Sequence, residues 1–289
     1  MPGMDKISEL EAARRVLVRR KAALGDVIMS TPVMARLRYL LGPDTIVDVE
    51  TAYPHVFIGN PHVNSARVSM EESYDLVIAL DNAYEKRRDL HTIDAYMVEA
   101  FGDTRWPSKE LFIAKHRLPE SIKLDWTRCV VLHPGQTSRA RTVTRGVWEG
   151  IINRLIGCNL IPVVVGATRE ISVADIDGVA DLTGRLSLQQ LATLIQYSRC
   201  FVSADTGMSH VAATTDTPIV TVYTSVFPQH RISWRHGVFS WRVTPLTPKL
   251  PCVGCIHECT RADYACIEGD HAVRADQIFD AIISAMEVQ

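Results

Sequence analysis

The sequence has no hydrophobic run long enough to cross a membrane. Its apolar runs are short, such as residues 161–165, whereas a membrane-spanning helix needs about 20 apolar residues. Residues 1–15 mix acids, bases and alanines and lack the apolar block of a signal peptide. These absences predict a cytoplasmic protein without a transmembrane segment, whose membrane association is limited to peripheral contact.

The chain also lacks a large net charge. The formal charge is −2 over 289 residues, which excludes a global electrostatic field that would drive the chain onto nucleic acid. A local excess of bases exists: one acid, Asp26, shares residues 14–38 with Arg14, Arg15, Arg19, Arg20, Lys21, Arg36 and Arg38. An anionic partner and a solvated charge run are both open interpretations, and the second is the more common one.

A dinucleotide-binding glycine motif is missing at the point where it would be expected. That motif needs three glycines for the turn, the pyrophosphate and the helix packing, and only Gly25 stands after the first strand. A dehydrogenase therefore loses its main support.

An alternation of strand-like and helix-like segments predicts parallel sheets with crossover helices. The chain is long enough for two domains, and 47% hydrophobic residues are enough to give each a core. The alternation breaks near residue 122, which predicts domains 1–122 and 123–289. Thr31 and Pro32 predict a helix start. The predicted strands are 16–20, 45–50, 75–80, 129–132, 161–165, 200–203 and 219–223, and the predicted helices are 32–41, 92–101, 147–156, 188–197 and 273–286.

Asp26 follows the first predicted strand, in the stretch Ala-Leu-Gly-Asp-Val at residues 23–27. The glycine allows a tight turn, which would present Asp26 at the carboxyl edge of the sheet, where ligands bind in open α/β folds. A general base and a helix cap are the two interpretations of this carboxylate.

A second stretch, residues 203–210, follows a strand and opens a short helix. The backbone amides and the hydroxyl of Thr206 predict an anion site suited to a diphosphate, and Asp205 could accept hydrogen bonds from sugar hydroxyls. His210 is interpreted either as part of this site or as a buried core histidine.

Basic and acidic loop residues follow two further strands. Arg139, Arg141 and Arg145 are candidates to neutralise a nucleotide diphosphate, although loop arginines are more often solvated. Glu170 is interpreted as a contact to ribose hydroxyls or as an ordinary acid at a helix start.

Together these segments resemble glycosyltransferase family 9, the bacterial ADP-heptose:lipopolysaccharide heptosyltransferases. The resemblance covers most of the chain and rests on the order of residues 23–27 with 31–32, 59–63, 74–78, 132–135, 181–185 and 205–210. It implies a GT-B fold, in which two Rossmann-like domains face a central cleft, and an inverting reaction that needs no divalent metal.

The resemblance also implies residue roles. Asp26 looks like the catalytic base, and the donor-binding residues would be His133, Arg139, Arg141, Glu170, Thr183, Gly184, Asp205, Thr206, Gly207 and His210. The donor would be an ADP-sugar, and the acceptor by default a lipopolysaccharide-core glycolipid at the inner membrane face. The chain is short for the family and its basic loop holds no lysine. A protein, a small molecule or a nucleic acid base is the alternative acceptor.

A cysteine cluster lies near the C-terminus. Cys252, Cys255, Cys259 and Cys266 have a spacing that could close a tetrahedral zinc or iron site, with His257 or His271 as a substitute ligand. Reduced thiols and disulfides are the alternatives. Any such metal would be structural, since the proposed chemistry does not use it.

Two rival functions share the architecture. One is a nucleotide-sugar epimerase, which would act on the donor without an acceptor. The other is a noncatalytic nucleotide-sugar-binding protein, in which Asp26 would only cap a helix.

Overall fold

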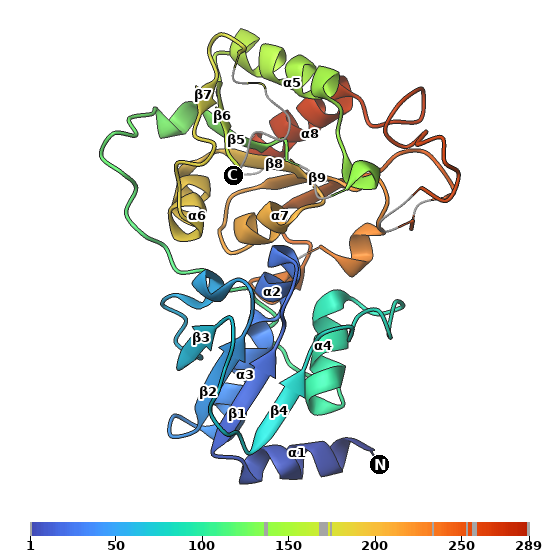
Figure 1. The fold of residues 1–289 in the computed structure, drawn as a ribbon. Helices are drawn as coiled ribbons and strands as arrows, with labels where there is room; N and C mark the ends of the chain where they lie inside the picture. Colours follow the sequence, from blue (N-terminus) through green and yellow to red (C-terminus); the bar gives the residue numbers. More distant parts are fainter. Residues whose placement is uncertain are drawn as a thin grey trace. The chain divides into compact units, whose positions relative to one another are not determined.

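A computed structural model of the chain describes residues 2–135, 138–167, 173, 175–232, 234–252, 254–255 and 259–287. The chain divides into two compact units, Met1–Ala114 with Ser233–Phe239, and Lys115–Ile232 with Ser240–Gln289 (Figure 1). Each is an α/β unit built on a parallel sheet, as the alternation of segments predicts. None of the helices in the described ranges is both long and apolar enough to cross a membrane.

The first unit carries a parallel sheet in the order β3-β2-β1-β4. Its strands are β1 (Arg15–Arg19), β2 (Ile46–Glu50), β3 (Ser65–Arg67) and β4 (Leu76–Ala79), and its helices are α1 (Pro2–Ala12), α2 (Leu24–Met29), α3 (Thr31–Leu41), η1 (Pro54–Phe57) and α4 (Thr92–Phe101). β1 pairs with β2 on one side and with β4 on the other. The chain therefore adds strands first on one side of β1 and then on the other, so the strand order reverses at β1 although all strands run parallel. Ligands in open α/β sheets bind outside the carboxyl ends of strands at such a reversal.

The second unit has the sheet order β12-β9-β8-β5-β6-β7. Its strands are β5 (Cys129–His133), β6 (Ile161–Val164), β7 (Ala180–Asp181), β8 (Cys200–Ala204), β9 (Ile219–Val222) and β12 (Val243–Leu246). Its helices are η2 (Trp126–Arg128), η3 (Arg139–Arg141), α5 (Arg145–Gly157), α6 (Leu188–Tyr197), α7 (Gly207–Ala212), η4 (Pro228–His230) and α8 (Ala275–Glu287). The reversal here falls at β5, between β6 and β8.

Alternating strand residues build the core of the second unit. Residues of one sheet face pack with α5 and α8, among them Val130, Leu132, Val202, Trp148, Ile151, Ile278 and Ile282. His133 follows Leu132, so its side chain points to the other face, as does that of Ser203 after Val202. α7 packs against β8 and β9, and α6 contacts α7.

The unit boundary differs from the sequence-based one. The first unit ends at Ala114, not near residue 122, and it recruits a late hairpin of β10 (Trp234–Arg235) and β11 (Val238–Phe239). Trp234 forms a parallel bridge with Glu110, and the Lys109 ammonium lies 4.9 Å from the Trp234 ring centroid. Such a long-range contact leaves no trace in local periodicity.

One helix start also differs. Ser30, and not Thr31, occupies the N-cap position of α3, and no side chain caps the helix. The Thr31 hydroxyl donates instead to the Ile28 carbonyl at 2.8 Å, because α2 leads almost directly into α3. The prediction of Pro32 in the first turn is confirmed.

Two glycines of α5 give a matched stability test. A Cβ on Gly150 would lie 2.8 Å from the Ala275 Cβ at the start of α8, whereas a Cβ on Gly146 would meet nothing within 4 Å. We expect Gly150→Ala to destabilise the protein by about 1–3 kcal/mol through overpacking. Gly146→Ala should stabilise it by up to about 1 kcal/mol through helix propensity. Urea unfolding of both variants checks the pair, and equal effects would contradict the close packing of α5 on α8.

Candidate functional site

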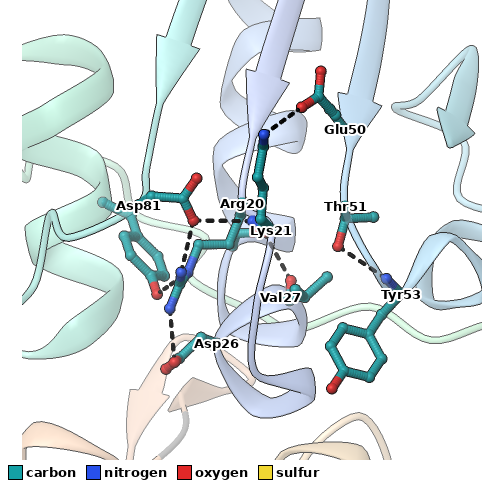
Figure 2. Close-up of polar contacts among 10 residues, drawn as sticks. Arg20, Lys21, Asp26, Val27, Glu50, Thr51, Tyr53 and Asp81 are labelled. Carbon is teal, nitrogen blue, oxygen red and sulfur yellow. Dashed lines mark hydrogen bonds and ion pairs between the residues drawn. The ribbon is translucent and has the colours of Figure 1, made fainter. Parts of the chain in front are cut away.

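A buried guanidinium organises the carboxyl edge of the first sheet (Figure 2). Arg20 follows β1, and its side chain is 7% exposed. It donates to Asp26 Oδ2 at 2.7 Å, to Asp81 Oδ1 at 2.9 Å and to the Tyr96 hydroxyl at 3.0 Å. Asp81 follows β4, so this network lies at the reversal of the sheet, where a ligand is expected.

Asp26 is not a helix cap. It lies in the first turn of α2, and the N-cap position belongs to Ala23, which makes no side-chain cap bond. Ala23 has a φ of 62°, so it is this alanine, and not Gly25, that adopts the left-handed backbone of the turn. The cap interpretation is therefore wrong, and the carboxylate of Asp26 is directed to Arg20.

The charges around Arg20 keep it ionised. Burial by itself lowers the pKa of Arg20, but Tyr96, Asp26 and Asp81 outweigh that effect and raise the pKa above its ordinary value. A fixed cation thus stands beside Asp26, where its hydrogen bond orients the carboxylate.

A second ion cluster lies on the neighbouring strand. Glu50, at the end of β2, accepts from Lys21 at 3.0 Å and from Arg19 at 3.3 Å. Burial tends to raise the pKa of Glu50, but the Lys21 hydrogen bond and the positive charges of Arg19 and Lys21 lower it overall. The basic side chains remain partly exposed, with 41% of Arg19 and 61% of Lys21 accessible.

The basic stretch at residues 14–38 is therefore not simply a solvated charge run. Arg20 is buried, and so is Arg36, which pairs with Asp103 at 2.9 Å and stacks on Phe101. Sequence reasoning missed Arg20, Asp81 and Tyr96 as parts of the site. An arginine directly after a strand and six positions before Asp26 was the available signal.

Removal of the Arg20 guanidinium should cost much more stability than removal of its exposed neighbour. We expect Arg20→Leu to lower the free energy of unfolding by about 3 kcal/mol, because Asp26 and Asp81 lose their shared cation. Tyr96→Phe, which deletes one hydrogen bond, should cost about 1 kcal/mol. Arg19→Leu, the control, should cost about 0.5 kcal/mol. Urea unfolding measures all three, and an Arg20 effect no larger than that of Arg19 would contradict the network.

In the second unit, the reversal between β5 and β8 brings His133 and the stretch after β8 together. The Thr206 hydroxyl lies 3.2 Å from His133 Nδ1 and accepts from the Met208 amide at 3.3 Å, so Thr206 caps α7. Gly207 begins α7, and His210 lies one turn further along and is buried. His133 thus supports the loop through Thr206.

Asp205 is a buried carboxylate with incomplete hydrogen bonding. It is 3% exposed, and its Oδ2 lies 3.5 Å from an Arg141 Nη1 without forming a hydrogen bond to any described residue. A buried carboxylate oxygen without a hydrogen bond is costly, so Asp205 Oδ2 is able to accept a hydrogen bond from a further donor.

The three loop arginines separate by their contacts. Arg141 pairs with Asp205, and its side chain is 14% exposed. Arg139 is exposed and stacks on Tyr264 at 4.2 Å, while Arg145 pairs at the surface with Glu149 and Asp175. Among these arginines Arg141 is the one placed beside the Asp205 loop.

Thr183 and Gly184 form a turn after β7. The Thr183 amide donates to Asp181 Oδ1 at 2.9 Å, and the Gly184 amide donates to the Gly166 carbonyl at 2.8 Å. Gly184 has a φ of 71°, which suits a glycine. The turn therefore joins the loop after β6. Glu170, predicted as a ribose contact, lies outside the described residues.

The four clustered cysteines are free thiols that line one small cavity, together with Thr224 and Asp263. Burial raises the pKa of Cys266, and the nearby Cys259 and Cys255 raise it further. Within the described ranges, however, no group of three or more His, Cys, Asp and Glu side chains is arranged to hold a metal ion. His257 lies outside those ranges. The thiols share a cavity but do not form a closed metal site.

Stability should depend on pH through His133. Burial lowers the pKa of His133 to about 4, so the folded protein keeps it neutral while the unfolded chain protonates near 6.5. Between these values the unfolded state binds more protons, so stability falls as pH drops from about 6.5, by about 3 kcal/mol once pH reaches 4. Urea unfolding at several pH values should show a shallower loss in His133→Gln. Identical pH slopes in wild type and variant would exclude a buried neutral imidazole.

Comparisons with known proteins agree with this geometry. The model of glycosyltransferase family 9 (heptosyltransferase) matches residues 166–261, which include the stretch after β8 and most of the cysteine cluster. No curated protein matches the sequence.

Several solved structures share the fold at low identity. A family 9 glycosyltransferase of Veillonella parvula is 15% identical, with 97% of this chain and 99% of that chain covered and a TM-score of 0.71. The iron-containing dodecameric glycosyltransferase TibC of enterotoxigenic E. coli is 13% identical over 96% and 79%, with a TM-score of 0.72, and was also solved with ADP-D-β-D-heptose. ADP-heptose lipopolysaccharide heptosyltransferase II of E. coli is 16% identical over 95% and 99%, with a TM-score of 0.67.

The family match falls mostly on the second unit, and the shared fold extends over nearly the whole chain. The shared fold agrees with the GT-B fold that the sequence motifs predict. The chain is therefore similar over residues 166–261 to the model of glycosyltransferase family 9, and it has the fold of solved family 9 enzymes.

Proposed function

We propose that this protein is a glycosyltransferase of family 9 that transfers a heptose from ADP-heptose to an acceptor hydroxyl, with inversion at the anomeric carbon. The observation that carries the proposal is the Arg20 network, which holds a carboxylate in a fixed orientation at the ligand-binding edge of the first sheet. TibC, whose fold is shared, binds ADP-heptose, which supports the same donor class here.

Asp26 would be the general base. Its carboxylate would take the proton of the acceptor hydroxyl as the oxygen attacks the anomeric carbon, on the face opposite the leaving diphosphate. Arg20 would hold one carboxylate oxygen and so fix the direction in which the carboxylate faces the hydroxyl. A positioned base of this kind contributes roughly a hundred- to ten-thousandfold in rate.

The second unit would bind the donor. Asp205 would accept a sugar hydroxyl, and Arg141 would face the diphosphate whose charge grows as the bond breaks. Thr206, Gly207 and His210 belong to the same loop and helix, and Thr183 and Gly184 would line the nucleotide edge. Glu170 remains the proposed ribose contact.

The charges that the reaction develops can be met by side chains. A carboxylate takes the proton and a guanidinium meets the diphosphate, so we propose a reaction that needs no divalent metal. The four cysteines are not arranged as a metal site among the described residues, but they line one cavity and would hold a structural zinc or iron if their thiols closed around it; TibC is itself iron-containing.

The proposed acceptor is anionic. Lys21 and Arg19 are partly exposed beside the Arg20 network and would attract a phosphate or carboxylate. Lipopolysaccharide core at the inner membrane face is the default acceptor, which would make the protein cytoplasmic and peripheral to the membrane. A protein, a small molecule and a nucleic acid base are the alternatives that an acceptor panel must include.

The test combines donor binding with turnover. Calorimetry with ADP-heptose and with ADP-, UDP- and GDP-hexoses should show selective ADP-heptose binding that Asp205→Asn weakens about tenfold or more, because the sugar loses a charged partner. In an acceptor panel with EDTA present, Asp26→Asn should lower kcat by a hundredfold or more while donor affinity stays unchanged. Asp44→Asn, at an exposed position between α3 and β2, is the matched control.

Each part of the proposal can fail separately. Selective binding of another nucleotide sugar would refute the heptose donor and leave the enzyme class. Full activity of Asp26→Asn would rule out Asp26 as the base. Nucleotide release that does not depend on any acceptor would favour a hydrolase, and conversion of the donor sugar without nucleotide release would favour the epimerase.

A further inference from the structure

The turn that carries Arg141 is the short helix η3, Arg139–Arg141, preceded by Ser138, which makes no side-chain cap bond. Inside the turn, the Arg141 amide donates to the Ser138 carbonyl at 3.0 Å and the Thr142 hydroxyl donates to the same carbonyl at 3.2 Å. Contacts that other segments make with so short a helix help to set its position.

A distant part of the chain contacts this turn from outside. We call residues 250–267 the cysteine loop; its described residues include Cys252, Cys255, Cys259 and Cys266. Tyr264 of the cysteine loop lies under the Arg139 guanidinium, which is 4.2 Å from the ring centroid. A guanidinium at this distance over an aromatic face is held by a cation–π interaction.

Thr224 makes a second link. This buried residue is the second residue after β9, and its hydroxyl donates at 2.5 Å to the carbonyl of Ala140, the middle residue of η3. Thr224 also lines the cavity that the four cysteines share. A neighbouring cavity is lined by Thr142, Val143 and Thr144 on one side and by Cys266 and Ile267 on the other.

The cysteine loop is in turn attached to the segment after β9. The Gly254 amide donates to the Ser225 carbonyl at 3.0 Å, and Cys266 and Ile267 are buried. The loop and η3 therefore form one packed layer, with Arg139 on its outer side and Arg141 on the side of Asp205.

We propose that Tyr264 is a positioning residue for the donor diphosphate. By holding Arg139 it fixes η3, and with it the guanidinium of Arg141 beside Asp205. Thr224 holds the middle of the same turn. The cysteine loop then serves donor binding through these contacts, and Arg139 acts through Tyr264 without touching the nucleotide. This inference rests on the proposed ADP-sugar donor.

The experiment compares ADP with adenosine, since only ADP carries the diphosphate. Calorimetry for ADP and ligand-observed NMR for adenosine give the two affinities of the full-length protein. We expect Tyr264→Leu to weaken ADP binding about fivefold, a loss that the strength of a cation–π contact permits, and to leave adenosine binding unchanged. Tyr264→Phe keeps the aromatic face and should bind ADP like the wild type.

A matched control removes a similar contact elsewhere in the same unit. The Arg154 guanidinium lies 5.8 Å from the Phe279 ring, between α5 and α8. Phe279→Leu should lower the melting temperature without changing the ratio of the two affinities. Thr224→Val keeps the volume of the side chain and deletes the hydrogen bond to Ala140. It should weaken the binding of ADP but not of adenosine. This variant tests the role of η3 even when Tyr264→Leu does not fold.

The outcomes distinguish the proposed ADP-sugar donor from the positioning role of Tyr264. A wild-type protein that binds ADP no better than adenosine would refute the ADP-sugar donor and this inference with it. A wild type that prefers ADP, with the same preference in Tyr264→Leu and Thr224→Val, would overturn the positioning role alone. An equal loss of ADP and adenosine would show that the cysteine loop supports the unit as a whole and not the diphosphate site.

Discussion

Parallel pairing of strands is the constraint on which both units depend. Every strand of a parallel sheet ends at the same edge, so the residues that follow successive strands are collected there whatever their separation in sequence. In the first unit this edge holds Arg20 and Asp81, and in the second it holds His133 and Asp205. The candidate site residues lie at these edges because parallel pairing brings the ends of successive strands together there.

Burial of charge distinguishes the two edges. In the first unit a cation is buried and its carboxylates are more accessible, with 7% of the Arg20 side chain exposed against 15% of Asp26 and 32% of Asp81. In the second unit the carboxylate is the more buried partner, with 4% of the Asp205 side chain exposed against 14% of Arg141. A base needs access to an incoming hydroxyl, and a sugar-binding carboxylate needs a dry environment, so the two arrangements suit the two roles proposed for them.

The described residues of the cysteine loop contact the rest of the second unit at several points. Its thiols line one cavity, Tyr264 contacts Arg139 of η3, and Thr224, which lines the same cavity, binds the middle of η3. Packing of this kind stabilises the turn that it contacts. The proposed donor site would therefore depend on residues that contact no substrate.

The sequence by itself determined most of the secondary structure and the class of fold. Periodicity and caps predicted α6 at Leu188–Tyr197 and α4 at Thr92–Phe101 with the bounds that the structure shows, because these elements are set by local patterns of apolar residues. It also placed Asp26 and Asp205 after strands, since short motifs mark those positions.

Only the tertiary structure decided which side chains meet. Arg20 contacts Tyr96 and Asp81, Arg139 contacts Tyr264, and Trp234 returns to the first unit, and each of these pairs is far apart in sequence. The positive φ of Ala23 could not be predicted from the sequence either, because an alanine gives no local signal for that backbone conformation. Local sequence encodes the elements, but the partners of a buried charge are chosen by the sheet that brings strand ends together.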